Sequence, residues 1–278
     1  MTHITRLWVT AALATGLSSA VIAQTAFDPH DLSGIWQITK GHRSISPNVP
    51  PMTAEGDARL NANKPTRGRF LGQPLNGEHP GFVRAVPVPA LGNDPAHKCN
   101  PNGFPRLLLD PEPVEFVQTR GRLLQLFQWE RTLRELWMDG RAVPSGESLD
   151  NLGPAWYGHT AGGWQGNTLV LNTVGLDDRA WIDIFGFPKS ASARIEERYT
   201  RTAPDTIELR LTLYDPAFYT QPWVSDVKTY TRVARQDTTF YGWYGLFSGL
   251  TEGICAPMNE VDSYNSLFRD RTSQGVIK

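Results

Sequence analysis

The feature that most constrains the fold is a strict alternation of apolar and polar residues late in the chain. Within residues 207–213 (IELRLTL), isoleucine or leucine occupies every second position, and charged or hydroxyl-bearing residues stand between them. Successive side chains of a β-strand point to opposite faces of the sheet. The pattern therefore predicts a strand with one face in the core and the other in water.

Other strand-like segments follow one another at short spacing, with turn residues such as Gly121 and Gly140 between them. No regular alternation of strands with helices is visible, which argues against a parallel α/β fold. We therefore expect an all-β fold, an antiparallel lipocalin-like barrel or a sandwich, with few short helices. The predicted strands are 114–119, 122–129, 132–138, 157–164, 168–174, 194–201 and 224–233, besides the alternating segment and one that begins at Gly34-Ile35-Trp36, a Gly-x-Trp sequence also found near the start of lipocalin barrels.

The chain divides into a leader and one domain. Residues 1–23 carry one basic side chain followed by an apolar run that ends in small residues, which is typical of a secretory signal peptide. We expect residues 24–278 to form a single domain: a Pro/Gly-rich extended wrap at 24–113, a strand core at 114–233 and an aromatic tail at 234–278. A helix is predicted at 53–63, with Thr53 as its N-cap. Export to the periplasm or the exterior follows, and no membrane span is expected in the mature chain.

Charge and cysteine content narrow the partners. The formal net charge is −1, and neither sign forms a block, so the basic surface of a nucleic-acid-binding protein is missing. A small hydrophobic or aromatic molecule is the expected partner. The two cysteines, Cys99 and Cys255, are predicted to form a disulfide in an oxidising compartment. A metal site on His97 and Cys99 is the alternative, but no second Cys or His stands nearby, and we predict no metal.

Two titratable residues of the strand core are candidates for chemistry. Alternation places Glu197 on the inward face of its strand, where an ionised carboxylate needs a partner. The structural interpretation is an ion pair with an inward arginine such as Arg134, and the functional one is a catalytic acid or base. His159 begins a strand beside Tyr157, and imidazole is the natural proton-transfer group near neutral pH. The alternative for His159 is a core histidine bonded to a backbone carbonyl.

A third candidate is the loop 175–183, which contains three carboxylates, Arg179 and Trp181. Asp178 and Asp183 at a barrel mouth would orient a reacting group or a proton donor. Alternatively, Asp177 and Asp178 form Asx turns and Asp183 pairs with Arg179. Tyr157, Trp181, Arg179, Tyr219 and Trp223 are the predicted substrate-binding residues. Phosphate-binding glycine loops, serine-hydrolase elbows and paired zinc histidines are absent from the sequence, so no cofactor is expected.

Several segments together resemble a large group of uncharacterised exported bacterial proteins with a lipocalin-like β-barrel: 31–36 (DLSGIW), 51–56 (PMTAEG), 99–106 (CNPNGFPR), 156–167, 175–183 and 197–199 (ERY). The resemblance covers most of the mature chain and implies export and β architecture. In that group a Gly-x-Pro sequence is commonly followed by His-Ser, whereas this chain has Lys189 at the histidine position.

These observations lead to one hypothesis and two alternatives. The hypothesis is an exported lyase or hydrolase that acts on a small hydrophobic or aromatic substrate by acid/base chemistry without an organic cofactor. His159 would transfer the proton, Asp178 and Asp183 would orient it, and Glu197 would be the second acid/base. The alternatives are a periplasmic carrier of hydrophobic small molecules and a glycan-binding or glycan-cleaving protein.

Overall fold

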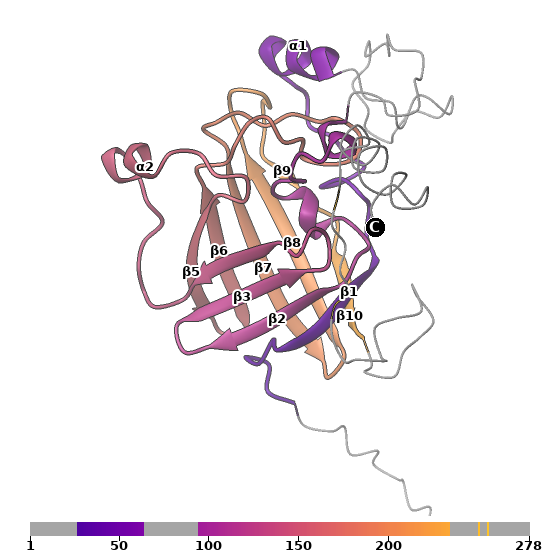
Figure 1. Cartoon of the computed structure of the whole chain (residues 1–278), viewed down its shortest axis with the longest axis vertical. Coiled ribbons are helices and arrows are strands. Elements are labelled where there is room, and N and C mark those ends of the chain that lie inside the picture. The colour runs from indigo at the N-terminus through magenta and orange to yellow at the C-terminus, as the bar shows by residue number, and fades with distance from the viewer. Residues whose placement is uncertain (1–26, 64–93, 234–249, 251–254, 256–278) are drawn as a thin grey trace, which may run out of the picture.

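The computed structural model describes residues 27–63, 94–233, 250 and 255. Nine of its strands close into a barrel, because the last of them, β10, pairs with both β1 and β8. The expected all-β fold is confirmed, and of the two architectures considered the barrel is correct (Figure 1). The barrel strands are β1 (Gly34–Lys40), β2 (Val114–Thr119), β3 (Arg122–Phe127), β4 (Leu133–Trp137), β5 (His159–Gln165), β6 (Thr168–Val174), β7 (Arg194–Ala203), β8 (Thr206–Tyr214) and β10 (Lys228–Arg232).

One strand pair departs from the expected antiparallel pattern. β4 and β5 are parallel and pair only through Leu136 with Thr160 and Trp137 with Ala161, whereas the other described barrel neighbours are antiparallel. A parallel pair cannot be joined by a tight hairpin, so the chain must cross over. Residues 138–158 make this crossover and contain the short helix α2 (Glu147–Leu152), which stands beside β5 in Figure 1.

The alternating segment behaves as predicted. Ile207, Leu209, Leu211 and Leu213 of β8 are at most 1% exposed. The single strand expected at 224–233 is wrong, because the chain forms β9 (Trp223–Val224) and β10 on either side of a break. At the break, the backbone N–H of Leu211 donates to the Ser225 hydroxyl at 2.8 Å, so a side chain replaces a rung of the ladder. β9 thus pairs with one end of β8 while β10 pairs with the other and closes the barrel.

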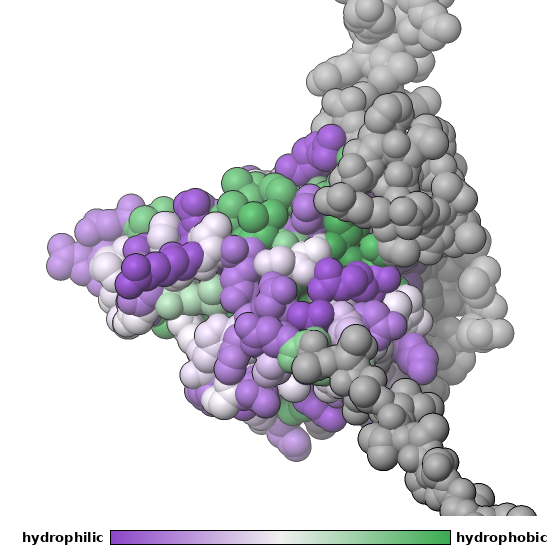
Figure 2. Space-filling model, turned by 90° about the horizontal axis from the view of Figure 1, so that it is seen from below, coloured by the Kyte–Doolittle hydropathy of each residue, from purple (hydrophilic) through white to green (hydrophobic). Residues whose placement is uncertain are grey.

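Large side chains fill the barrel. Trp36 is fully buried, and its indole N–H donates to the Leu32 carbonyl at 2.8 Å. Burying aromatic rings of this size contributes strongly to stability because much apolar area leaves water. The surface seen in Figure 2 is mixed, with hydrophilic residues interspersed among hydrophobic ones. Within the described residues, no helix is long and apolar enough to cross a membrane.

The described part of the N-terminal wrap contains the predicted helix. α1 (Ala54–Asn63) begins after Thr53, whose hydroxyl accepts from the Gly56 N–H at 3.1 Å, so the N-cap is confirmed. Gly56 is needed for close approach, since a Cβ there would lie 2.3 Å from the carbonyl oxygen of Phe218. The wrap residues 64–93, the leader 1–23 and most of the tail 234–278 lie outside the described residues.

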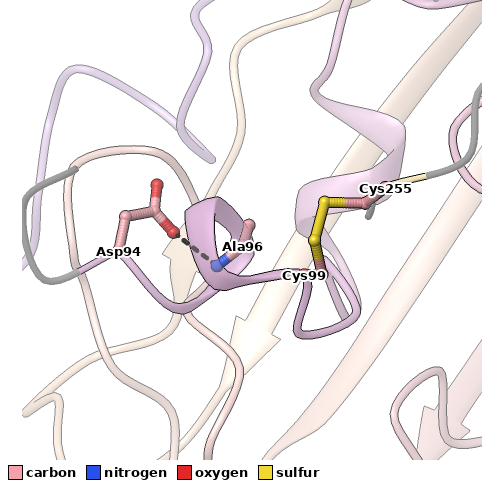
Figure 3. Close-up of a disulfide and its surroundings, with 4 residues drawn as sticks. All are labelled: Asp94, Ala96, Cys99 and Cys255. Atoms are coloured by element: carbon pink, nitrogen blue, oxygen red, sulfur yellow. Dashed lines mark hydrogen bonds between the residues drawn. A yellow bond between two sulfur atoms is a disulfide. The ribbon is translucent and has the colours of Figure 1, made fainter. Parts of the chain in front are cut away.

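The predicted disulfide is confirmed. Cys99 and Cys255 are bonded, with their Cα atoms 5.5 Å apart, across 156 residues of sequence (Figure 3). Cys99 follows the short 3-10 helix η2 (Pro95–Lys98), which begins where the Asp94 carboxylate accepts from the Ala96 N–H at 3.1 Å. A second 3-10 helix, η3 (Arg106–Leu108), lies nearby in sequence, and the Arg106 guanidinium holds the same carboxylate at 2.7 and 2.9 Å.

Candidate functional site

A groove lies on the outer face of the barrel, where the crossover 138–158 passes over β4 and β5. Its volume is about 790 Å³, within the range of roughly 300–1,000 Å³ for small-molecule sites. The barrel wall gives one side and α2 with its flanking loops gives the other. The lining residues are Leu133, Arg134, Glu135, Trp137, Arg141, Ala142, Pro144, Ser148, Leu152, Ala155, Trp156, Tyr157, Gly158, His159, Thr160 and Ala161.

Apolar and aromatic side chains dominate this lining. Leu133 on β4 is 49% exposed and Leu152 on α2 is 58% exposed, although both are large and hydrophobic. Single exposed leucines are common on protein surfaces. Here the two line one groove from different elements, together with Trp137 and Trp156. A flat apolar molecule between them would remove both leucines from water.

His159 and Tyr157 are the polar groups predicted from sequence that line the groove. Nε2 of His159 lies 3.0 Å from the carbonyl oxygen of Gly153, as the structural interpretation of this histidine expected. The Tyr157 hydroxyl lies 3.2 Å from the Thr132 hydroxyl, and burial raises the pKa of the tyrosine. His159 faces the outside of the barrel, because the next residue, Thr160, contributes its hydroxyl to the interior.

The charged side chains that line the groove on its outer side already have partners. Glu135 accepts from the Arg122 guanidinium at 2.8 Å, and Arg141 donates to Asp139 at distances from 2.6 Å. The Arg141 guanidinium also lies 3.7 Å from the centre of the Trp137 ring. These pairs balance one another, so the groove favours a ligand without a large net charge.

Glu197 lies inside the barrel, on the other side of this wall. Its side chain is fully buried and forms a two-point ion pair with Arg134, with N–O distances of 2.6 and 2.9 Å. The ion pair predicted from sequence is confirmed. Burial alone would lower the pKa of Arg134, but the facing Glu197 carboxylate raises it, so the guanidinium stays charged.

Hydroxyl and amide groups add hydrogen bonds to this pair, although the buried Nε of Arg134 has no partner. Thr160 and Thr173 accept from the Arg134 guanidinium at 2.9 and 2.8 Å. Gln125 accepts from it at 3.0 Å, and Tyr199 donates to Glu197 at 2.8 Å. A buried polar network with its charges matched in this way specifies the arrangement of the core.

Asp183 lies at a different place, buried beside the N-terminal wrap. One of its oxygens accepts a hydrogen bond from the Ser44 hydroxyl, and the other accepts from the backbone N–H of Phe185 at 2.8 Å. Burial raises the pKa of Asp183 to about 6, although these hydrogen bonds oppose the rise. The alternative pairing of Asp183 with Arg179 is wrong, because Arg179 pairs with Asp177 at 2.5 Å.

The remaining loop residues divide between the surface and the core. Asp177 forms the expected Asx turn, accepting from the Arg179 N–H at 2.9 Å, and the Arg179 guanidinium lies 4.5 Å from the Trp156 ring centre. Asp178 is exposed and Trp181 is buried. Lys189 is fully buried, its ammonium donates to the Ala180 carbonyl at 2.5 Å, and burial lowers its pKa to about 8.

Tyr219 and Trp223 pack in the core rather than on the groove. Both are at most 2% exposed, and their ring centres lie 5.5 Å apart. The Tyr219 hydroxyl donates to the Pro188 carbonyl at 2.8 Å, and burial raises its pKa well above the ordinary value.

The predicted site residues therefore do not share one cavity. His159 and Tyr157 line the outer groove, Glu197 lies within the barrel, and Asp183 lies beside the wrap. In the part of the chain that the structure describes, no three side chains form a cluster suited to a metal ion.

Sequence reasoning missed Leu133, Trp137 and Leu152, which form much of the groove. A signal was present in β4 (LRELW): Arg134 shares a face with Leu136, whereas Leu133 and Trp137 share a face with Glu135. A charged residue at an inward position, with large apolar residues at outward positions, indicates a strand whose outer face contacts another group as well as solvent.

Comparison of the chain with protein-family models, with curated proteins and with solved structures found no match. The resemblance to a group of exported bacterial proteins stays a prediction, although the barrel that it implies is present.

Proposed function

We propose that this protein binds a small, flat and mainly apolar molecule in the groove beneath the crossover 138–158. The observation that carries the proposal is the pair of large exposed leucines, Leu133 and Leu152, that line this one cavity from opposite elements. Aromatic side chains add surfaces on which a ring can stack. The function is that of a carrier or receptor for a hydrophobic small molecule.

The geometry favours binding over acid/base catalysis by the four residues considered from sequence. His159 lines the groove, but Asp178, Asp183 and Glu197 do not, so they cannot reach a ligand bound there. Glycan cleavage by a carboxylate pair has less support still, because Glu135 is the only carboxylate among the described lining residues. Export is part of the proposal. The disulfide is compatible with an oxidising compartment, and the leader-like sequence 1–23 supplies the route.

Titration of the mature protein with 2-methoxynaphthalene tests the proposal, with tryptophan fluorescence as the signal because Trp137 and Trp156 line the groove. Replacing both leucines (Leu133→Ser with Leu152→Ser) removes apolar contact at two exposed positions. We expect a loss of about 1 kcal/mol for each, or roughly 30-fold in affinity together.

Val224→Ser is the matched control, since Val224 is 56% exposed and lies outside the groove. It should bind the probe as the wild type does. The proposal is wrong if the wild type does not bind the probe, or if the double variant binds it with unchanged affinity.

A further inference from the structure

We infer that the groove selects ligands that carry a hydroxyl group or a similar hydrogen-bond donor, and that Nδ1 of His159 accepts this hydrogen bond. The inference rests on the proposed function and names the class of ligand: a flat aromatic alcohol or phenol rather than a plain hydrocarbon, an ether or an anion.

The first step is the tautomer of His159. Its Nε2 lies 3.0 Å from the Gly153 carbonyl oxygen, and a carbonyl oxygen can only accept a hydrogen bond. Nε2 therefore carries a hydrogen. In the neutral ring the other nitrogen, Nδ1, then has a free lone pair and is an acceptor.

The second step is the direction of the ring. A Cβ on Gly175 would lie 2.8 Å from Cδ2 and 3.5 Å from Nε2 of His159, so that edge of the ring packs closely against the chain. Nδ1 is on the opposite edge, and the side chain lines the groove. Within the described residues, no group donates a hydrogen bond to Nδ1.

The third step is that the other acceptor-bearing side chains on the outer side of the described groove already hold a hydrogen-bond partner, while the indole N–H groups of Trp137 and Trp156 can only donate. Glu135 accepts from Arg122, Arg141 donates to Asp139, and the Tyr157 hydroxyl is bonded to Thr132. Ser148 donates to the Ser145 carbonyl at 2.8 Å. The unpaired acceptor on His159 therefore distinguishes apolar ligands that carry a hydrogen-bond donor from those that do not.

The acceptor on His159 should affect which ligand binds more than how tightly ligands bind in general. A ligand that covers Nδ1 without offering a donor strips water from an acceptor and leaves it unpaired. A ligand with a hydroxyl group at the same place replaces that water bond. The difference between two otherwise matched ligands should be about tenfold in affinity.

The test compares 2-naphthol with 2-methoxynaphthalene near neutral pH, on the mature protein, by isothermal titration calorimetry. The two probes share their aromatic rings, but only the naphthol donates a hydrogen bond. We expect the naphthol to bind about tenfold more tightly. In His159→Phe the preference should vanish, while the affinity for 2-methoxynaphthalene stays the same or increases.

His30→Phe is the matched control, because Nε2 of His30 also lies 2.9 Å from a backbone carbonyl, that of Gly166, but the residue is outside the groove. It should keep the preference. Equal binding of both probes by the wild type, or a preference that survives His159→Phe in a variant with wild-type circular dichroism, would overturn the inference.

The experiments distinguish failure of the proposed function from failure of this inference. If both probes bind equally and the leucine double variant weakens both, the groove binds apolar molecules but does not select hydroxyl groups. If neither probe binds, the proposed function and this inference are both wrong.

Discussion

Arg134 and Glu135 are neighbours on β4, yet they face opposite sides of the barrel wall. Arg134 forms an ion pair in the core, whereas Glu135 forms one on the surface. Inward, Arg134 belongs to a network in which its charge meets Glu197 and its two terminal nitrogens donate to threonine and glutamine oxygens. Outward, the same strand presents Leu133 and Trp137 to a groove in which one imidazole nitrogen has no described partner. A buried charge that faces its counter-charge is explained by the core around it, whereas an exposed apolar surface beside an unpaired acceptor points to a ligand.

The largest effect that would test this contrast is expected from Glu197→Gln. The substitution keeps the shape of the side chain but leaves the buried Arg134 guanidinium without a counter-charge, which costs about 3–5 kcal/mol of unfolding free energy. Urea denaturation of the two proteins measures the difference from their midpoints. The variant that remains folded should bind 2-methoxynaphthalene as the wild type does.

Glu135→Gln is the matched variant on the outer face. Its partner Arg122 and the carboxylate are 38% and 43% exposed, so the loss should be no more than about 1 kcal/mol. If both substitutions cost the same, the assignment of one ion pair to the core and the other to the surface fails.

The next largest effect concerns Asp183 and pH. The pKa of this carboxyl is raised from 3.8 to about 6 in the folded protein, chiefly by burial. Between these values the folded state holds a proton that the unfolded state has lost. The contribution of Asp183 to stability is therefore complete below the lower value and is lost as pH rises through about 6.

Asp183→Asn removes this titration. The stability of the variant relative to the wild type should rise by about 2 kcal/mol between pH 4 and pH 7, as measured by urea denaturation at several pH values. Asp177→Asn is the control, and its effect on stability should change with pH in the opposite direction, because hydrogen bonds from Arg179 lower the pKa of Asp177. The ionised Asp177 carboxylate stabilises the folded protein above the ordinary pKa of an aspartate, and this stabilisation is lost as pH falls below it. A pH-independent difference for Asp183→Asn would contradict the raised pKa.

The smallest effect compares adjacent glycines of β5. A Cβ on Gly162 would lie 2.0 Å from the carbonyl oxygen of Val170, whereas one on Gly163 would meet nothing within 4 Å. Gly162→Ala should lower the unfolding free energy by about 1–3 kcal/mol, because backbone must move. Gly163→Ala should change it by less than about 0.5 kcal/mol. Thermal unfolding followed by circular dichroism distinguishes the two, and a tolerated Gly162→Ala would show that this wall of the barrel is looser than described.

The fold was largely predictable because period-two patterns are local. The bounds of β2 and β6 agree with those expected from sequence, and so does the inward direction of Glu197. The parallel pairing of β4 with β5 was not predictable, since it depends on how nine strands close around one core. The break between β9 and β10 was missed because a serine side chain substitutes for a backbone partner, which no periodicity reveals.

The candidate site was predictable only in part. His159 and Tyr157 were identified from their residue types, and both line the groove. Asp183 and Glu197 were grouped with them because the sequence shows which residues can titrate but not on which side of a wall they lie. Leu152 comes from α2, whose approach to the barrel is a consequence of the crossover and has no sequence pattern of its own.

The crossover 138–158 also bears on how such a protein can change. It joins two strands whose pairing is already short, it runs outside the barrel, and it supplies one wall of the groove while the strands supply the other. Residues 141–148 of this segment are mostly exposed and free of the constraints that fix the interior, whereas Ala155 and Gly158 are held against neighbouring strands and loops. Substitutions in this segment, by evolution or by protein engineering, could change which ligand the groove binds while the barrel stays the same.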